Sequence, residues 1–327
     1  MTGATILGCA GPVLSSTEAA FFRDADPWGF ILFRRNVESA VQLRALTAAL
    51  RDTMGRDAPV FMDQEGGTVA RLRPPLARSW DDANAQAGGA EAVRLRHRLM
   101  AAELRACGVD GNCAPVIDVA GPDTHPFLQR RIWSSDPAEV ALLARAAAEG
   151  LLAGGVLPVI KHLPGHGAAN ADTHLELARC KTPLAALQTH DFVPVRALAD
   201  LPLGMTGHMV IEALDPDTPA TLSPVVLRYL RDSLGFDGLL MTDDLNMNAL
   251  GGTLPDRAAR AIAAGCDLVL HCSGEMGEMP GVVAASGTLG AQAANRANRA
   301  LAMRREPAAI DIVAATADFE RLSNARA

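Results

Sequence analysis

Short apolar runs alternate along the chain with longer segments in which apolar residues recur every three or four positions. The short runs are typical of buried strands, and the longer segments are typical of helices with one apolar face. We expect eight strands, at residues 4–11, 29–36, 59–65, 112–120, 157–163, 203–211, 238–244 and 266–272. We expect helices at residues 39–54, 90–107, 136–154, 223–235, 255–265 and 290–306.

This alternation predicts an α/β fold built on a parallel sheet. Eight strand–helix units favour a closed (β/α)₈ barrel of the TIM type, for which 327 residues is an ordinary length. An open, doubly wound sheet is the alternative architecture. No linker or low-complexity stretch divides the sequence, so we expect a single domain over residues 1–327.

Composition narrows the class of protein. A content of 49% hydrophobic and 4% aromatic residues suits helices packed closely on a sheet, and a net charge of −7 without a clustered basic face excludes a nucleic-acid partner. No apolar run is long enough to span a membrane. The six cysteines form no CxxC pair, which indicates free thiols in a reducing compartment. We therefore expect a cytoplasmic protein, and we take it to be a monomer.

Polar residues gather where the predicted strands end. Charges at these positions are costly in a core but natural at the mouth of a barrel, which is where the active sites of such folds lie. The residues concerned are Arg34–Asn36, Asp63–Glu65, Asp118, Lys161, His162, His208, Asp243, Asp244 and His271.

The stretch "KHLPGHGAANADTH" (161–174) is the part of the chain densest in reactive side chains. His162 and His166 are four residues apart, but Pro164 and Gly165 between them exclude the helix that would place such a pair on one metal ion. The glycines also match no phosphate-binding pattern. The sequence therefore favours neither a metal site nor a phosphate site here.

The end of the same stretch suggests proton transfer. Asp172 and His174 are two residues apart, so both project to one side of an extended segment. The carboxylate would then fix the tautomer of the imidazole and raise its basicity, as an acid/base group requires. A loop histidine with a chance acidic neighbour is the alternative.

Two further pairs of residues have two interpretations each. Asp63 and Arg71 flank a Gly-Gly turn, where they would either hold vicinal hydroxyls or form a structural ion pair, and both interpretations stay open. Of the adjacent Asp243 and Asp244, one must face the barrel mouth because side chains alternate along a strand. That carboxylate would act as a nucleophile, a base or a metal ligand, and the other would cap the next helix.

Six stretches follow one another along the chain: "GFILFRRNV", "DQEGGTVARL", "RIWSSDP", "KHLPGHGAANADTH", "GHMVIEALDPDTPATLSP" and "LGFDGLLMTDDLNM". Together, in this order, they resemble glycoside hydrolase family 3. They are most similar to its bacterial single-domain β-N-acetylglucosaminidases (β-N-acetylhexosaminidases) of peptidoglycan recycling. The resemblance runs from about residue 5 to residue 272, and it implies a TIM-type barrel.

The resemblance implies hydrolysis with retained configuration, without a metal or cofactor. Asp243 aligns with the nucleophile that forms a glycosyl-enzyme, and His174 with an acid/base held by Asp172. The implied substrate is a muropeptide fragment that ends in N-acetylglucosamine. The residues implied to bind that sugar are Asp63, Arg71, Arg131, Lys161 and His162.

The resemblance also assigns supporting roles and leaves departures. Asp244 would be structural, and His166 would brace the glycine-rich loop. Trp133 would pack in the core, with a position beside the sugar as the alternative. Arg130 replaces an acidic residue that the family usually has beside Arg131, and there are further departures at Thr68 and Ala168. A glycoside phosphorylase of the same fold, a glycan-binding protein that has lost turnover and a metal-dependent hydrolase are the alternative functions.

Overall fold

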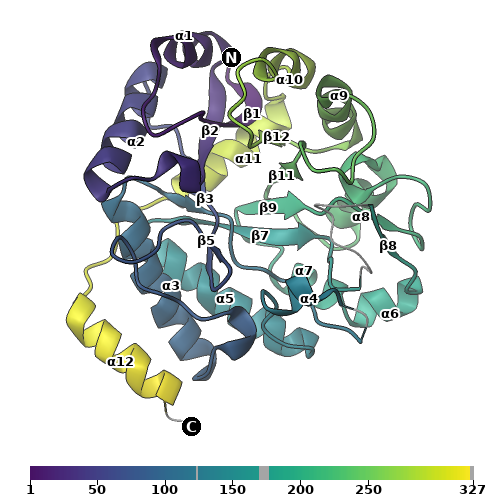
Figure 1. Cartoon of the computed structure of the whole chain (residues 1–327). Coiled ribbons are helices and arrows are strands. Elements are labelled where there is room, and N and C mark those ends of the chain that lie inside the picture. The colour runs from purple at the N-terminus through teal and green to yellow at the C-terminus, as the bar shows by residue number, and fades with distance from the viewer. Residues whose placement is uncertain (123, 169–176, 325–327) are drawn as a thin grey trace.

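The computed structural model describes residues 1–122, 124–168 and 177–324. At its centre, eight strands form a closed barrel in the order β1-β12-β11-β9-β7-β6-β3-β2, with every neighbouring pair parallel (Figure 1). This confirms the predicted barrel. The strands are β1 (Gly3–Gly8), β2 (Pro27–Leu32), β3 (Val60–Met62), β6 (Gly111–Asn112), β7 (Leu157–Leu163), β9 (Leu203–Thr206), β11 (Leu239–Asp244) and β12 (Leu268–His271).

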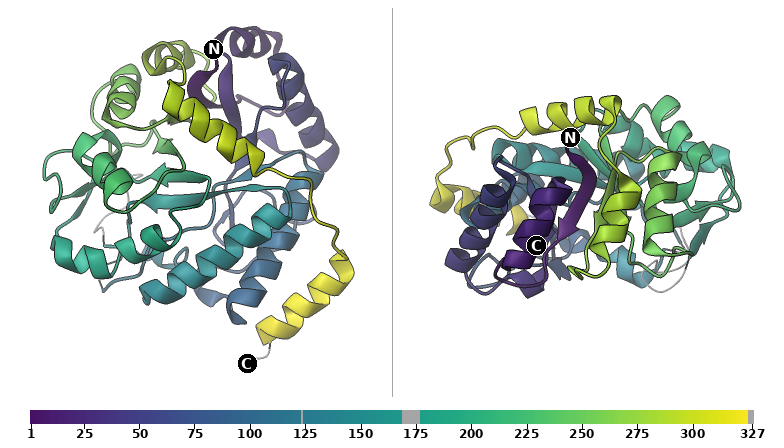
Figure 2. Two further views of the ribbon diagram at one scale, coloured as in Figure 1. Left: turned by 180° about the vertical axis from the view of Figure 1, so that it is seen from behind. Right: turned by 90° about the horizontal axis from the view of Figure 1, so that it is seen from above.

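Helices surround the barrel, as the views from behind and above show (Figure 2). Those at the predicted positions are α2 (Ala40–Met54), α3 (Gly89–Ala106), α5 (Pro137–Ala153), α8 (Pro224–Asp232), α9 (Leu254–Ala264) and α11 (Ala291–Ala302). Six further helices were not expected from the periodicity: α1 (Ser16–Ala25), α4 (Pro126–Gln129), α6 (Leu184–Thr189), α7 (Phe192–Ala197), α10 (Met279–Ser286) and α12 (Ile312–Asn324).

Local sequence explains where the helices begin. The Asp136 and Ser223 side chains accept hydrogen bonds from main-chain N–H groups of the first turns of α5 and α8, and a proline opens each helix. Helix α12 lies outside the ring of barrel helices, against α3 (Figure 1). The Phe319 ring meets Trp80 edge to face there, with ring centroids 5.4 Å apart.

Several predicted strands extended too far, and the one expected at 4–11 ends at Gly8. The strand expected at 112–120 is only Gly111–Asn112, followed by an isolated bridge between Val116 and Lys161. Pro115, which lies between them, has no N–H to donate to a ladder. The run at 203–211 divides into β9 and β10 (Met209–Ile211), and β10 pairs with β8 (Ala178–Cys180) outside the barrel. The run at 59–65 contains β3 and then the first residues of a second strand, β4 (Gln64–Gly66). Strand β4 forms a hairpin with β5 (Val69–Ala70). Residues Arg34–Asn36, predicted as strand, form the 3₁₀ turn η1.

Apolar side chains fill the inside of the barrel. Ile31, Phe61, Val159, Met205 and Met241 belong to one buried cluster there. The space beside Gly111 admits no side chain, because a Cβ atom at that position would lie 2.2 Å from the Phe61 ring. The interior is therefore closed below the mouth, and polar groups collect at the carboxyl ends of the strands.

The expectations about the cysteines and about membrane-spanning segments can be compared with the structure. All six cysteines lie within the described ranges, and they are free and buried. None of the helices in the described parts of the chain combines the length and the apolar character that crossing a bilayer requires.

Candidate active site

A cavity of about 240 Å³ opens at the carboxyl ends of the strands. Six residues predicted for the site line it: Asp63, Arg71, Arg131, Lys161, His162 and Asp243. The cavity is also lined by Glu65, Thr68, Val69, Phe127, Leu128 and His166. Asp172 and His174, the predicted acid/base pair, lie outside the described residues.

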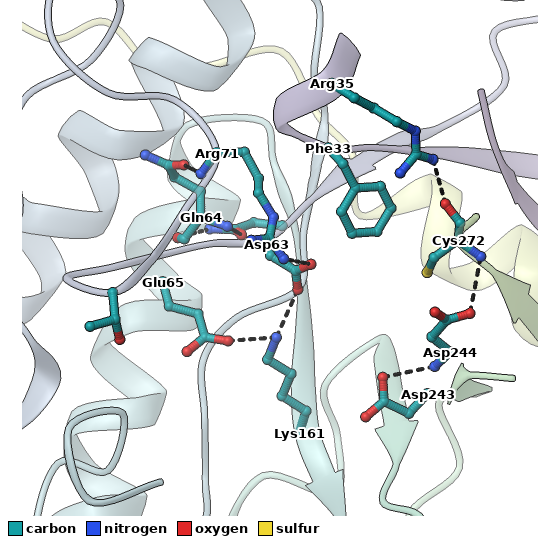
Figure 3. A network of polar contacts seen from close by, with 12 residues as sticks. Phe33, Arg35, Asp63, Gln64, Glu65, Arg71, Lys161, Asp243, Asp244 and Cys272 are labelled. Atoms are coloured by element: carbon teal, nitrogen blue, oxygen red, sulfur yellow. Dashed lines mark hydrogen bonds and ion pairs between the residues drawn. The ribbon is translucent and has the colours of Figure 1, made fainter. Parts of the chain in front are cut away.

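Alternating charges form the wall of the cavity. The Lys161 ammonium donates to Asp63 Oδ1 at 2.9 Å and contacts Glu65 Oε1 at 2.6 Å (Figure 3). Beyond Asp63, the Arg71 guanidinium donates to Oδ2 at 2.9 Å. Beyond Glu65, Arg131 makes a two-pronged pair, with both distances 2.9 Å. The result is a continuous chain of ion pairs, Arg71–Asp63–Lys161–Glu65–Arg131.

These charges are buried, and their partners decide their ionisation. Lys161 is only 2% exposed. Burial acts to raise the pKa of Asp63, but Lys161 and Arg71 outweigh it and hold that pKa well below its usual range. Burial acts on the pKa of Glu65 in the same way, and Arg131 and Lys161 keep it low. Burial acts to lower the pKa of Lys161, but Asp63 and Glu65 raise it. Asp63, Glu65 and Lys161 are therefore all charged near neutral pH.

The "DQEGG" stretch folds so that Arg71 meets Asp63. The buried Gln64 amide accepts from the main-chain N–H groups of Arg71 at 2.9 Å and Leu72 at 3.0 Å, and donates to the Leu72 carbonyl at 2.9 Å. Gly66 and Gly67 make the turn with φ of 104° and 55°, a region that favours glycine. One glutamine thus holds together a hairpin that points both charges at the cavity.

An irregularity in β7 brings two consecutive side chains to the cavity. Adjacent residues of a regular strand point to opposite faces, yet Lys161 and His162 both line the cavity. The register between β7 and β9 shifts between Lys161 and Leu163, and such bulges redirect side chains. His162 then contacts the buried Asp118, with 2.7 Å between Nδ1 and Oδ2.

Asp243 lies apart from the chain of ion pairs, on β11 across the cavity mouth (Figure 3). Its Oδ1 accepts the main-chain N–H of Asp244 at 2.8 Å. Burial acts to raise the pKa of Asp243, but His162, His208, the main-chain N–H of Asp244 and the Lys161 ammonium together lower it below its ordinary value. The site therefore presents an ionised carboxylate that no cation holds in a short ion pair among the described residues, as a nucleophile requires.

Asp244 has the structural role that was expected of it. Its Oδ1 accepts main-chain N–H groups of Asn246 at 3.2 Å and Cys272 at 3.1 Å, which ties the end of β11 to the end of β12. Trp133 is half-buried and packs against the apolar cluster of Val93 and Leu143, and it is not among the residues that line the cavity.

Arg130 and Arg131 have different partners. Arg130 turns away from it, toward Asp82 at 3.9 Å, while Arg131 keeps its pair with Glu65. The departure at position 130 therefore leaves the charge of Arg131 paired. Thr68, a second departure, lines the cavity wall itself.

Glu65 and Asp118 were expected at the barrel mouth, but no individual role was predicted for either, and none was predicted for the His166 ring. Glu65 belongs to a motif that was quoted, and Asp118 ends a predicted strand, but their partners lie 66 and 44 residues away. The main chain of His166 does brace its loop, by donating to Asp118 Oδ1 at 2.8 Å. The ring instead lines the cavity, without a hydrogen-bond partner among the described residues, and burial lowers its pKa to about 4.

The sequence of this chain is similar to those of known proteins. The family described as "Glycosyl hydrolase family 3 N terminal domain" matches residues 14–303. A beta-hexosaminidase of Alkalilimnicola ehrlichii is 40% identical over 290 residues, which cover 84% of this chain and 81% of that protein.

Solved structures agree with the sequence comparison. NagZ from Neisseria gonorrhoeae, in complex with N-trifluoroacetyl-D-glucosamine, superimposes with a TM-score of 0.85 at 28% identity, covering 99% of this chain and 98% of that one. A glycoside hydrolase family 3 β-N-acetylglucosaminidase from Paenibacillus has a TM-score of 0.87 at 27% identity, covering 98% of this chain and 67% of that one.

We predict that Glu65→Gln lowers the free energy of unfolding at neutral pH by about 3 kcal/mol, because Arg131 and Lys161 lose a buried partner. The pKa of Glu65 in the folded protein lies below its ordinary value of 4.5. Its ionised form therefore stabilises the fold above that pH, and the contribution disappears as pH falls through the folded-state pKa. The difference between the two proteins should shrink below about pH 4.

Urea unfolding followed by circular dichroism from pH 7 to pH 3 measures this difference. Glu275→Gln is the matched control, since Glu275 is exposed and its carboxylate has no ion-pair or hydrogen-bond partner among the described residues. A Glu65→Gln curve that runs parallel to the wild-type curve at all pH values would contradict the prediction.

Proposed function

The chain belongs to glycoside hydrolase family 3, and from this premise we propose that it is a retaining exo-β-N-acetylglucosaminidase. The names of its relatives support the activity, and one structural neighbour holds an N-acylated glucosamine. The observation on which the proposal depends is the ionised Asp243 facing a cavity whose other wall is a chain of buried ion pairs.

The dimensions of the cavity favour one terminal sugar. Its volume of about 240 Å³ lies below the range of roughly 300–1,000 Å³ typical of sites for drug-sized ligands. The wall offers carboxylates that accept hydrogen bonds and cationic groups that donate them, which suits neighbouring hydroxyl groups. In the proposal, Asp63, Arg71 and Lys161 hold that sugar together with Arg131 and His162.

The reaction would proceed in two displacements. Asp243 attacks the anomeric carbon while His174 protonates the departing glycosidic oxygen, so that the carbon–oxygen bond breaks as a glycosyl ester forms. His174, now deprotonated, takes a proton from water, and the resulting hydroxide displaces Asp243. Asp172 orients His174 in both steps. The low pKa of Asp243 supports this role, because the nucleophile must be ionised at neutral pH.

The wider setting follows the family resemblance. We propose a single catalytic domain over residues 1–327, monomeric and cytoplasmic, acting on muropeptide fragments of peptidoglycan that end in N-acetylglucosamine. The free, buried thiols are in keeping with a reducing compartment.

We predict that Asp243→Ala lowers kcat/KM for an aryl N-acetyl-β-glucosaminide by at least about 10⁴-fold, because the covalent step loses its nucleophile. Asp232→Ala, which removes an exposed carboxylate that does not line the cavity, is the matched control and should retain wild-type activity. Wild-type turnover by the Asp243 variant would refute the assignment.

Reactions of the wild type with and without inorganic phosphate should release the same free sugar, whereas accumulation of a sugar 1-phosphate would identify a phosphorylase.

We predict that His174→Ala slows hydrolysis of glycosides with poor leaving groups far more than that of activated aryl glycosides, since only the former need protonation. The measurement is kcat/KM across a series of aryl glycosides that differ in leaving-group pKa. An equal loss for all members would exclude His174 as the acid.

A further inference from the structure

Asp118 is a buried carboxylate that the proposed reaction does not use. It is 0% exposed, in the segment that follows β6. Its Oδ2 contacts His162 Nδ1 at 2.7 Å, and its Oδ1 accepts the main-chain N–H groups of His162 at 3.2 Å and His166 at 2.8 Å. One side chain thus anchors both the imidazole of His162 and the backbone on either side of the turn.

The second nitrogen of His162 identifies the tautomer. His162 Nε2 lies 3.4 Å from an Arg131 Nη2 atom. A guanidinium group only donates hydrogen bonds, so a hydrogen bond at this contact requires Nε2 to be the unprotonated acceptor. The proton of the ring then lies on Nδ1, where it is donated to Asp118. Two independent contacts therefore agree on the same tautomer.

The neighbouring charges disfavour a proton on Nε2. Arg131 is held in place by its two-pronged pair with Glu65, and Lys161 is fixed by Asp63 and Glu65. A donor on Nε2 would face the donors of Arg131 with no acceptor between them. The tautomer set by Asp118 is thus also the one that the cationic wall accepts.

We propose that Asp118 is a positioning residue that keeps His162 as a hydrogen-bond acceptor toward the cavity, so that one hydroxyl of the terminal sugar donates to Nε2 and accepts from Arg131. That hydroxyl would replace the long contact between the two side chains. The inference rests on the proposed function, because it requires a sugar in this cavity. It makes the site selective for a group that donates and accepts together, which an ether or a fluorine cannot do.

Asp118→Asn tests this inference with a near-isosteric side chain. The amide oxygen would keep the two main-chain N–H groups, and the amide nitrogen would face His162 Nδ1 as a donor. The ring proton must then move to Nε2. We expect kcat/KM for an aryl N-acetyl-β-glucosaminide to fall about 10- to 100-fold, mainly through KM, which corresponds to the loss of one hydrogen bond to a charged or polarised group.

Deoxyfluoro substrates distinguish positioning from a structural effect. A fluorine accepts but does not donate, so the wild-type enzyme should discriminate against the deoxyfluoro sugar at one of positions 3, 4 and 6. In Asp118→Asn that discrimination should largely disappear. The matched control is Asp267→Asn, a buried carboxylate paired with Arg231 and Arg296 at the opposite end of the strands. A purely structural role for Asp118 would lower activity on all substrates by the same factor and would overturn the inference.

The ring ¹⁵N chemical shifts of His162 give a readout independent of turnover. In histidine-labelled protein, assigned with a His162→Gln variant, the wild type should show Nδ1 protonated and Nε2 bare. A protonated Nε2 in the wild type would overturn the inference even if Asp118→Asn failed to fold. Absence of hydrolysis in a wild type with the expected tautomer would instead refute the proposed function alone.

Discussion

The site depends on the buried chain of ion pairs that runs from Arg71 through Lys161 to Arg131. Removing charges from water costs several kcal/mol per ion, and only close partners with good geometry compensate for this cost. Lys161 is therefore stable in the wall only because Asp63 and Glu65 both contact it. These ion pairs link the β4–β5 hairpin, the end of β7 and the segment after α4. The cavity therefore exists only when these separate parts of the sequence have come together.

In the proposed reaction, this arrangement separates the residues that bind the sugar from the residue that reacts with it. The cations of the wall are paired with Asp63 and Glu65, which leaves Asp243 across the cavity ionised and without a short ion pair among the described residues. A carboxylate locked in a salt bridge would be a poor nucleophile, because the reaction would have to break the pair. Behind the wall, Asp118 supports the histidine that completes it. The site is thus built as a polar shell around one reactive group.

The fold was predictable because long segments of regular periodicity define it, and six helices lie within a few residues of their predicted positions. The strand ends were less predictable, since Pro115 and the bulge in β7 change the pairing in ways that periodicity does not report. The positions of Asp63, Lys161 and Asp243 followed from the rule that polar strand ends meet at the barrel mouth. Their partners did not, because pairs such as Arg131 and Glu65 join residues far apart in the chain, and the sequence contains no sign of which charges will touch.

Covalent trapping tests the central claim most directly. A 5-fluoro-N-acetylglucosaminyl fluoride slows both displacements, while its fluoride leaving group restores the first, so a glycosyl-enzyme should accumulate. Mass spectrometry of proteolytic fragments should then locate one N-acetyl-5-fluoroglucosaminyl group on Asp243 and none in Asp243→Ala. Steady turnover of the reagent with no label, or a label on a different residue, would contradict the account.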